Sequence, residues 1–297
     1  MTVLKPKDAH QKDEKERKVT FLSKESIKCP VCEELFKREE LFTGRVNASD
    51  LTDELHRLYI PMQAWGEVLP LVYDLVVCPA CWYAAFKQDF LAAPPAARAA
   101  LANDVSPRLD AAQRVFDGVD FASPRTPIEG AASYYLALMS YDAFPKEFAP
   151  TIKQGVCALR AAWLCDLLAA KRPGENFDYA ARLFYRKARF LYRRAVELEQ
   201  SGKERIGEMK WLGPDTDKNY GYEGVLYLQG ILELKYGPRS DPAKRAERLD
   251  SSKRAVAKLF GLGRRSKSKP GPLLDKARDF YDSVKKELSQ DEDDDDE

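Results

Sequence analysis

The sequence predicts a mainly α-helical protein in which a small cysteine-rich module precedes a longer array of antiparallel helix pairs. Two observations lead to this prediction. Two Cys-Pro-x-Cys pairs lie in the first third of the chain, and from about residue 93 apolar residues recur at helical spacing between Pro and Gly separators. The chain has 297 residues, 44% of them hydrophobic, which is enough for a sizeable core.

Composition divides the chain into four segments. Residues 1–20 are densely charged and show no apolar periodicity, so we expect a flexible arm. Residues 21–92 carry β-branched and aromatic runs around the cysteine pairs and are predicted to form a four-cysteine module. Residues 93–290 are predicted to form the helical domain, after an Ala/Pro-rich joint. Residues 291–297 are all acidic and are predicted to form a disordered tail.

The two cysteine pairs are the strongest chemical signal in the chain. They read Cys29-Pro30-Val31-Cys32 and Cys78-Pro79-Ala80-Cys81. Both sulfurs of a Cys-x-x-Cys turn can bind one ion, and two such turns supply the four soft ligands of a tetrahedral zinc site. The sequence therefore predicts one structural Zn²⁺ bound by Cys29, Cys32, Cys78 and Cys81. Because four cysteines fill the coordination sphere, no open position remains for a catalytic metal.

The surroundings of the pairs are similar to a zinc ribbon that carries an insertion. Each pair follows a short β-prone run, at residues 26–28 and 75–77. The segment between the pairs, residues 33–77, is longer than the roughly 15–20 residues of a compact ribbon. We therefore expect this segment to fold as an additional element.

A thiol redox centre is the alternative interpretation of the same cysteines. Such a centre needs an accessible thiolate, commonly at a helix N-terminus, and the second pair precedes a possible helix at residues 82–90. The matching form of the two pairs favours one shared metal.

Cys157 and Cys165 lie more than two turns apart on one predicted helix, too far to bond to each other, and are expected in the core. His56 is expected on a surface helix and not at a metal.

Helical periodicity is clearest at residues 179–199. Apolar residues there recur at steps of three and four and form one stripe, which consists of Ala181, Phe184, Tyr185, Ala188, Leu191, Tyr192, Ala195 and Leu198. Further helices are predicted at residues 128–144, 152–170, 222–236, 242–260 and 272–288. The spacing of Ala181, Tyr185 and Ala188 resembles a tetratricopeptide (TPR) unit, and Gly230 could be the small residue of a neighbouring helix. Because the repeat period is irregular, the prediction is a TPR-like array, with an ordinary helical bundle as the alternative.

Three stretches resemble a known bacterial family. Residues 70–84 read PLVYDLVVCPACWYA, which resembles the domain-of-unknown-function family DUF2225, with its Pro-x-x-Tyr, β-run and Cys-Pro-x-Cys-Gly-Tyr-Ala pattern. The first cysteine pair with Phe36, and residues 159–164 (LRAAWL), are also similar to that family. The resemblance covers most of residues 25–260 and implies a zinc-knuckle segment followed by TPR-like helices in the bacterial cytosol, without an assigned activity. Trp82 stands where the family usually has glycine. If that glycine adopts a left-handed turn, this chain must turn differently there.

Charge is balanced overall but unevenly distributed. Lys plus Arg is 48 and Asp plus Glu is 47, which argues against a uniformly basic nucleic-acid-binding protein. Basic residues concentrate at residues 239–269, and Arg264, Arg265, Lys267 and Lys269 form a basic patch in a predicted loop. The patch could contact phosphate, an acidic protein or the acidic tail. It lacks aromatic residues for base stacking, so nucleic acid is the least favoured partner.

A second cationic set lies on the helix with the clearest periodicity. Arg182, Arg186, Arg189 and Arg193 follow helical spacing on a face other than the apolar stripe. Such a stripe is a candidate binding surface for an acidic partner protein. The alternative is an ordinary solvated helix face.

No recognisable catalytic motif is present. The chain has no phosphate-binding loop, no nucleophile elbow and no zinc-protease motif. We therefore predict a non-enzymatic, zinc-stabilised scaffold whose TPR-like surface binds another protein. The alternatives are a thiol redox enzyme and a nucleic-acid-associated zinc protein. Because the chain has no signal-peptide pattern and no 18-residue uncharged apolar segment, we expect no membrane span and a cytoplasmic location.

Overall fold

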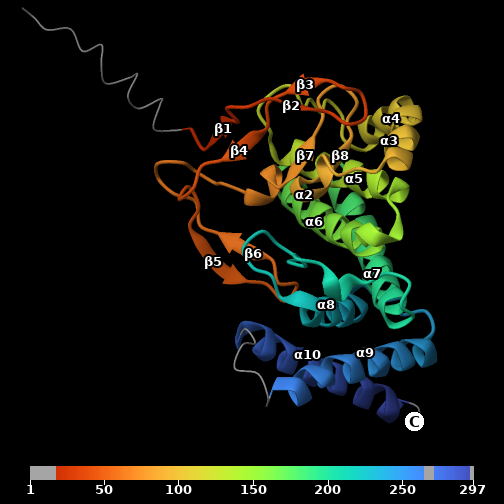
Figure 1. Cartoon of the computed structure of the whole chain (residues 1–297). Coiled ribbons are helices and arrows are strands. Elements are labelled where there is room, and N and C mark those ends of the chain that lie inside the picture. Colours follow the sequence, from red (N-terminus) through yellow and green to blue (C-terminus); the bar gives the residue numbers. More distant parts are fainter. Residues whose placement is uncertain (1–17, 264–270, 295–297) are drawn as a thin grey trace, which may run out of the picture.

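The computed structural model describes residues 18–263 and 271–294 and is mainly α-helical, with the strands gathered near the N-terminus (Figure 1). The α-helices are α2 (Lys87–Phe90), α3 (Pro95–Asn103), α4 (Val105–Val115), α5 (Pro127–Ser140), α6 (Pro150–Lys171), α7 (Phe177–Gln200), α8 (Gly221–Tyr236), α9 (Pro242–Gly263) and α10 (Gly271–Asp294). Short 3₁₀ helices are η1 (Pro70–Tyr73), η2 (Tyr141–Ala143), η3 (Lys146–Phe148) and η4 (Ile206–Glu208). The predicted fold class, a mainly α protein with a small cysteine-rich module, is confirmed.

Among the described residues, the strands form two-stranded antiparallel sheets. The pairs are β1 (Thr20–Leu22) with β4 (Glu39–Leu41), β2 (Ile27–Lys28) with β3 (Leu35–Phe36), β5 (Ala48–Leu51) with β6 (Arg57–Tyr59), and β7 (Leu75–Val77) with β8 (Ala84–Phe86). The hairpins β2–β3 and β7–β8 each enclose one cysteine pair. The long segment between the pairs also folds, and it contains β3, β4, the β5–β6 hairpin and η1.

Helix α7 shows how the sequence pattern produces the packing. Its predicted apolar stripe is buried throughout, from Ala181 to Leu198. On the neighbouring helix α6, Gly155 faces Tyr192 of α7 so closely that a Cβ there would lie 3.1 Å from the ring. The small residue therefore lets α6 and α7 approach each other, as the predicted helix pairs require.

Consecutive helices stack along the chain. Each helix from α4 to α10 packs against the next, and α10 also contacts α8 (Figure 1). Helix α5 begins with a capping box formed by Thr126 and Glu129 and packs against both β7 and β8. Because β7 and β8 are completely buried, the cysteine-rich module and the helices share one continuous core.

Several elements differ from the sequence-based expectation. The possible helix at residues 82–90 is replaced by a turn, strand β8 and the short helix α2, because the chain pairs back onto β7. The Ala/Pro-rich joint contains the start of α3, where Pro95 occupies the first helical turn. Helix α10 continues to Asp294, into the acidic segment, since extending an existing helix is easier than starting one.

Residues 1–17 of the predicted arm and the end of the predicted tail, residues 295–297, lie outside the described residues. Within the described ranges, no helix combines the length and apolar character needed to cross a membrane.

Candidate metal centre

The structure brings the four paired cysteines together at one point. Their sulfurs all lie within 4.8 Å of one another. The Sγ atoms of Cys29 and Cys81 are 3.8 Å apart, and those of Cys32 and Cys78 are 3.5 Å apart. Tetrahedral bonds of about 2.3 Å to one ion place sulfurs on the order of 3.7 Å apart. The four side chains therefore have the donor type and the spacing to hold a metal ion.

The two hairpin turns that carry the cysteines have the same backbone geometry. In the first, Cys29 N–H donates to the carbonyl of Glu34 at 2.8 Å; in the second, Cys78 N–H donates to Tyr83 at 2.9 Å. The residue after the second cysteine of each pair is left-handed, with φ of 66° at Glu33 and 55° at Trp82. The expectation that the chain turns differently at Trp82 is wrong. The tryptophan itself adopts the conformation that glycine favours, held by burial and by an edge-on contact with Phe121.

The sulfurs influence one another's ionisation. Hydrogen bonds from the Cys78 and Cys81 thiols lower the pKa of Cys29 to about 2, despite its burial. In turn, the hydrogen bond to Cys29 raises the pKa of Cys78 to about 12, and hydrogen bonds to Cys29 and Cys78 raise the pKa of Cys81. By itself the cluster therefore stabilises one thiolate and resists further ionisation. A cation that neutralises the charge would allow all four sulfurs to ionise.

Surrounding groups hold the second turn in place. The guanidinium of Arg108 on α4 is buried and donates to the carbonyl of Cys81 through Nε at 3.3 Å and Nη2 at 2.7 Å. It also donates to Leu101 of α3 at 3.0 Å. The hydroxyl of Tyr83 donates to the carbonyl of Phe90, and the two rings stack. Cys29, Cys78 and Cys81 are buried while Cys32 is exposed, so the cluster lies at the edge of the core.

The β5–β6 hairpin attaches the cysteine-rich module to the helices, which sequence reasoning did not predict. At its tip, the buried carboxylate of Glu54 accepts hydrogen bonds from Trp163 Nε1 at 2.8 Å, Tyr236 OH at 2.7 Å and Lys235 Nζ at 3.1 Å. The neighbouring Asp53 pairs with Lys276 of α10 at 2.8 Å. One turn of the insertion thus joins α6, α8 and α10.

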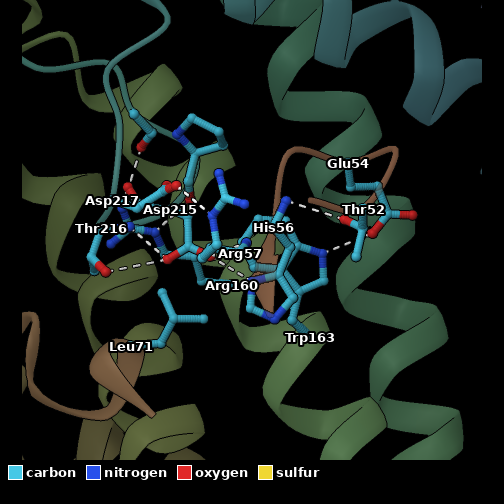
Figure 2. Close-up of polar contacts among 12 residues, drawn as sticks. Thr52, Glu54, His56, Arg57, Leu71, Arg160, Trp163, Asp215, Thr216 and Asp217 are labelled. Carbon is cyan, nitrogen blue, oxygen red and sulfur yellow. Dashed lines mark hydrogen bonds and ion pairs between the residues drawn. The ribbon is translucent and has the colours of Figure 1, made fainter. Parts of the chain in front are cut away.

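His56 lies just before β6 and not on a surface helix, which corrects the sequence-based expectation (Figure 2). Its ring stacks on Trp163 with centroids 4.3 Å apart, and its Nδ1 lies 2.5 Å from Oδ2 of Asp215. The same oxygen accepts the backbone N–H of Arg57 at 2.9 Å. Burial alone would raise the pKa of Asp215, but the hydrogen bond from His56 and the positive charges of His56 and Arg160 lower it overall.

Arg160, labelled in Figure 2, joins two of the three family-like stretches of the sequence. This fully buried residue of α6 forms an ion pair with Asp74, which follows η1. Its guanidinium also donates to the backbone carbonyls of residues 213–215 at 2.7–3.2 Å and to Tyr134 OH at 3.3 Å. Asp74 lies in residues 70–84 and Arg160 in residues 159–164, so both partners of this ion pair lie in stretches that resemble the family.

The cationic stripe of α7 divides between the surface and a helix contact. Arg182 and Arg186 are exposed. Arg189 is largely buried and pairs with the buried carboxylate of Glu233 on α8 at 2.7 Å, so it holds two helices together. Arg193 is half-buried and lies 3.6 Å from Glu197.

The remaining predicted residues are the two cysteines of α6 and the basic patch. Cys157 and Cys165 are both completely buried in α6, as expected for core residues. Burial raises the pKa of Cys165 to about 12, which keeps its thiol protonated. The predicted basic patch, Arg264, Arg265, Lys267 and Lys269, lies outside the described residues.

The fold and the site define a mainly helical protein with a four-cysteine cluster that could hold a metal ion. A family model described as "Uncharacterized protein conserved in bacteria (DUF2225)" matches residues 22–284. A protein of Borreliella burgdorferi, described as "Uncharacterized protein", is 39% identical over 275 residues, which cover 92% of this chain and 98% of that relative. The chain therefore belongs to the DUF2225 family. No solved structure matches it.

Proposed function

We propose that this protein is a zinc-stabilised, non-enzymatic cytoplasmic scaffold that binds an acidic partner protein on the outer face of α7. The observation that carries the proposal is a row of large apolar side chains left exposed on that helix. Tyr179, Leu183 and Phe190 are 56%, 45% and 46% exposed. Their spacing of four and seven residues places them on one face. Clustered exposed apolar side chains are typical of protein-binding surfaces.

The charges beside this row indicate the kind of partner. Arg182 and Arg186 are exposed on the same helix, as is Lys187. Arg182 has a weak exposed pair with Asp178 at 2.9 Å, which water and salt screen. An acidic partner with apolar side chains would satisfy both features, because opposite charge guides the approach and aromatic contacts supply affinity.

Zinc is the metal that best suits the four sulfurs. Four thiolates at tetrahedral spacing are the donor set of structural zinc, and their closed arrangement offers no position for substrate. In this proposal the metal would hold the two hairpins against each other and so stabilise the packing of β7 and β8 on α5. A thiol redox enzyme is less favoured, because strand β8, and not a helix N-terminus, follows the second pair.

The experiment compares partner capture by matched surface variants. Leu183→Glu combined with Phe190→Glu places two carboxylates on the proposed face, and Leu91→Glu changes a side chain that is 61% exposed elsewhere. Tagged full-length proteins are expressed in the native host, and captured proteins are quantified by mass spectrometry. We expect the double variant to lose an acidic partner that the wild type and Leu91→Glu retain, with an unchanged melting temperature. The same captured set for all three proteins would contradict the proposal.

A further inference from the structure

A second surface feature lies on the cysteine-rich module, away from α7. An open groove of about 1120 Å³ runs between the two-stranded β1–β4 sheet and strand β7. Figure 1 places these strands at the opposite end of the molecule from α8–α10. The groove is lined by residues 18–22, 36–39, 42, 73, 75–77, 79, 87 and 121–125. It borders the metal centre, because Val77 and Pro79 flank Cys78.

The walls of the groove expose apolar side chains. Phe21 and Phe42 are each 37% exposed, and Leu22 is 64% exposed. Val76 and Val77, both buried in β7, also line the groove. Exposed aromatic rings above an aliphatic base are the composition expected of a surface that buries apolar side chains of a partner.

The charged residues of the groove are mostly basic. Lys18, Lys37, Arg38, Lys87 and Arg125 line it, against the single carboxylate of Glu39. That carboxylate already accepts hydrogen bonds from the Thr20 hydroxyl at 2.7 Å and the Arg125 backbone N–H at 3.0 Å. Lys18, Lys37 and Lys87 are exposed, and no carboxylate in the described part of the chain pairs with them. The groove therefore attracts negative charge.

Size and strand arrangement favour a peptide. The volume exceeds the roughly 300–1,000 Å³ of typical small-molecule pockets. Strand β1 has one strand partner among the described residues, and an extended peptide can add main-chain hydrogen bonds to such a strand. Nucleic acid fits less well. The rings of Phe21 and Phe42 pack against each other, with centroids 4.7 Å apart, and Glu39 would repel a phosphate.

We propose that this groove binds an extended acidic segment of a partner protein, in which aromatic or aliphatic side chains alternate with Asp or Glu. Alternate side chains of an extended chain point to opposite faces. The apolar ones contact Phe21, Phe42 and β7, while the carboxylates reach the lysines at the rim. The site is independent of the α7 surface, so either can fail without the other.

The test uses full-length, metal-loaded protein and a fluorescein-labelled peptide of sequence DFEFDFE. Binding is followed by fluorescence anisotropy at low salt. We expect saturable binding that weakens at high salt, and at least about tenfold weaker binding of the peptides KFKFKFK and DSESDSE. The first groove variant, Lys37→Glu with Lys87→Glu, should also weaken binding by about tenfold. Its matched control, Lys146→Glu with Lys203→Glu, changes exposed lysines outside the groove and should bind as the wild type does.

A second variant tests the apolar wall. Phe21→Ser with Phe42→Ser should weaken binding of DFEFDFE while leaving the melting temperature within a few degrees, because both side chains are exposed. Equal binding by the groove variants and the lysine control would overturn the proposal. If a labelled twelve-nucleotide oligothymidylate binds more tightly than DFEFDFE, and the same variants lose that binding, the groove binds nucleic acid instead. If the peptide does not bind, and the wild type forms a dimer in sedimentation that the phenylalanine variant does not form, the groove binds a second copy of the chain instead.

Discussion

Replacing Glu54 by alanine should detach the β5–β6 hairpin from the helices. The Glu54 carboxylate is 6% exposed and is the shared acceptor for Trp163 Nε1 and Tyr236 OH. Hydrogen bonds to a charged acceptor contribute about 1.5–3 kcal/mol each, and both donors would lose their partner. The third donor, Lys235, keeps a partly solvated side chain and adds little. We therefore expect the free energy of unfolding to fall by about 3–5 kcal/mol.

The assay is urea denaturation followed by circular dichroism, with Asp53→Ala as the matched control. Asp53 is the adjacent residue on the same hairpin tip, but its side chain is 52% exposed. Its pair with Lys276 should therefore contribute less than about 1 kcal/mol. If Glu54→Ala and Asp53→Ala destabilise the protein equally, the buried carboxylate does not hold the hairpin on the helices.

Three further changes test other parts of the structure. Glu33→Gly should raise the unfolding free energy by about 0.5–1 kcal/mol in urea denaturation, because Glu33 is left-handed; Glu34→Gly, where φ is not positive, should lower it. Asp215 has a lowered pKa, so its contribution to stability is complete above about pH 3.9 and is lost as the pH falls through its folded-state pKa. Asp215→Asn should thus flatten the loss of stability below pH 4, and an unchanged acid profile would contradict this. Gly230→Leu should destabilise by about 1–3 kcal/mol, because a Cβ at Gly230 already lies 2.9 Å from the Phe280 ring. A double-mutant cycle with Phe280→Ala should show strong coupling, and additive effects would argue against this contact.

Features that depend on local pattern could be predicted from the sequence. The apolar stripe of α7 repeats over about five turns, so its buried face follows from periodicity alone. The convergence of the cysteines follows from donor chemistry, because two Cys-Pro-x-Cys turns together supply one complete ligand set. The β-prone runs before each pair correctly indicated β2 and β7.

Features that depend on distant contacts could not be predicted. His56 meets Asp215, and Glu54 meets Trp163, across more than one hundred residues, and no periodicity connects such positions. Arg189 looked like a surface cation because helical spacing does not show where a neighbouring helix covers the face.

Predictions from local sequence were also wrong where tertiary packing determines the backbone conformation or where a helix-start signal was overlooked. Trp82 adopts a left-handed conformation that its side chain disfavours, because burial in the core compensates. Helix α3 was missed because an Ala/Pro-rich stretch was interpreted as a joint, although proline in the first turn is a helix-start signal.

The metal content of the purified protein decides whether the four clustered cysteines bind zinc. Full-length protein, dialysed free of loosely bound ions, is analysed by plasma mass spectrometry together with Cys29→Ser and the buried-cysteine control Cys165→Ala. We expect one zinc ion per chain in the wild type and in Cys165→Ala, and its loss in Cys29→Ser. Absence of zinc from the wild type, or retention of a full equivalent by Cys29→Ser, would contradict a structural zinc site at the four cysteines.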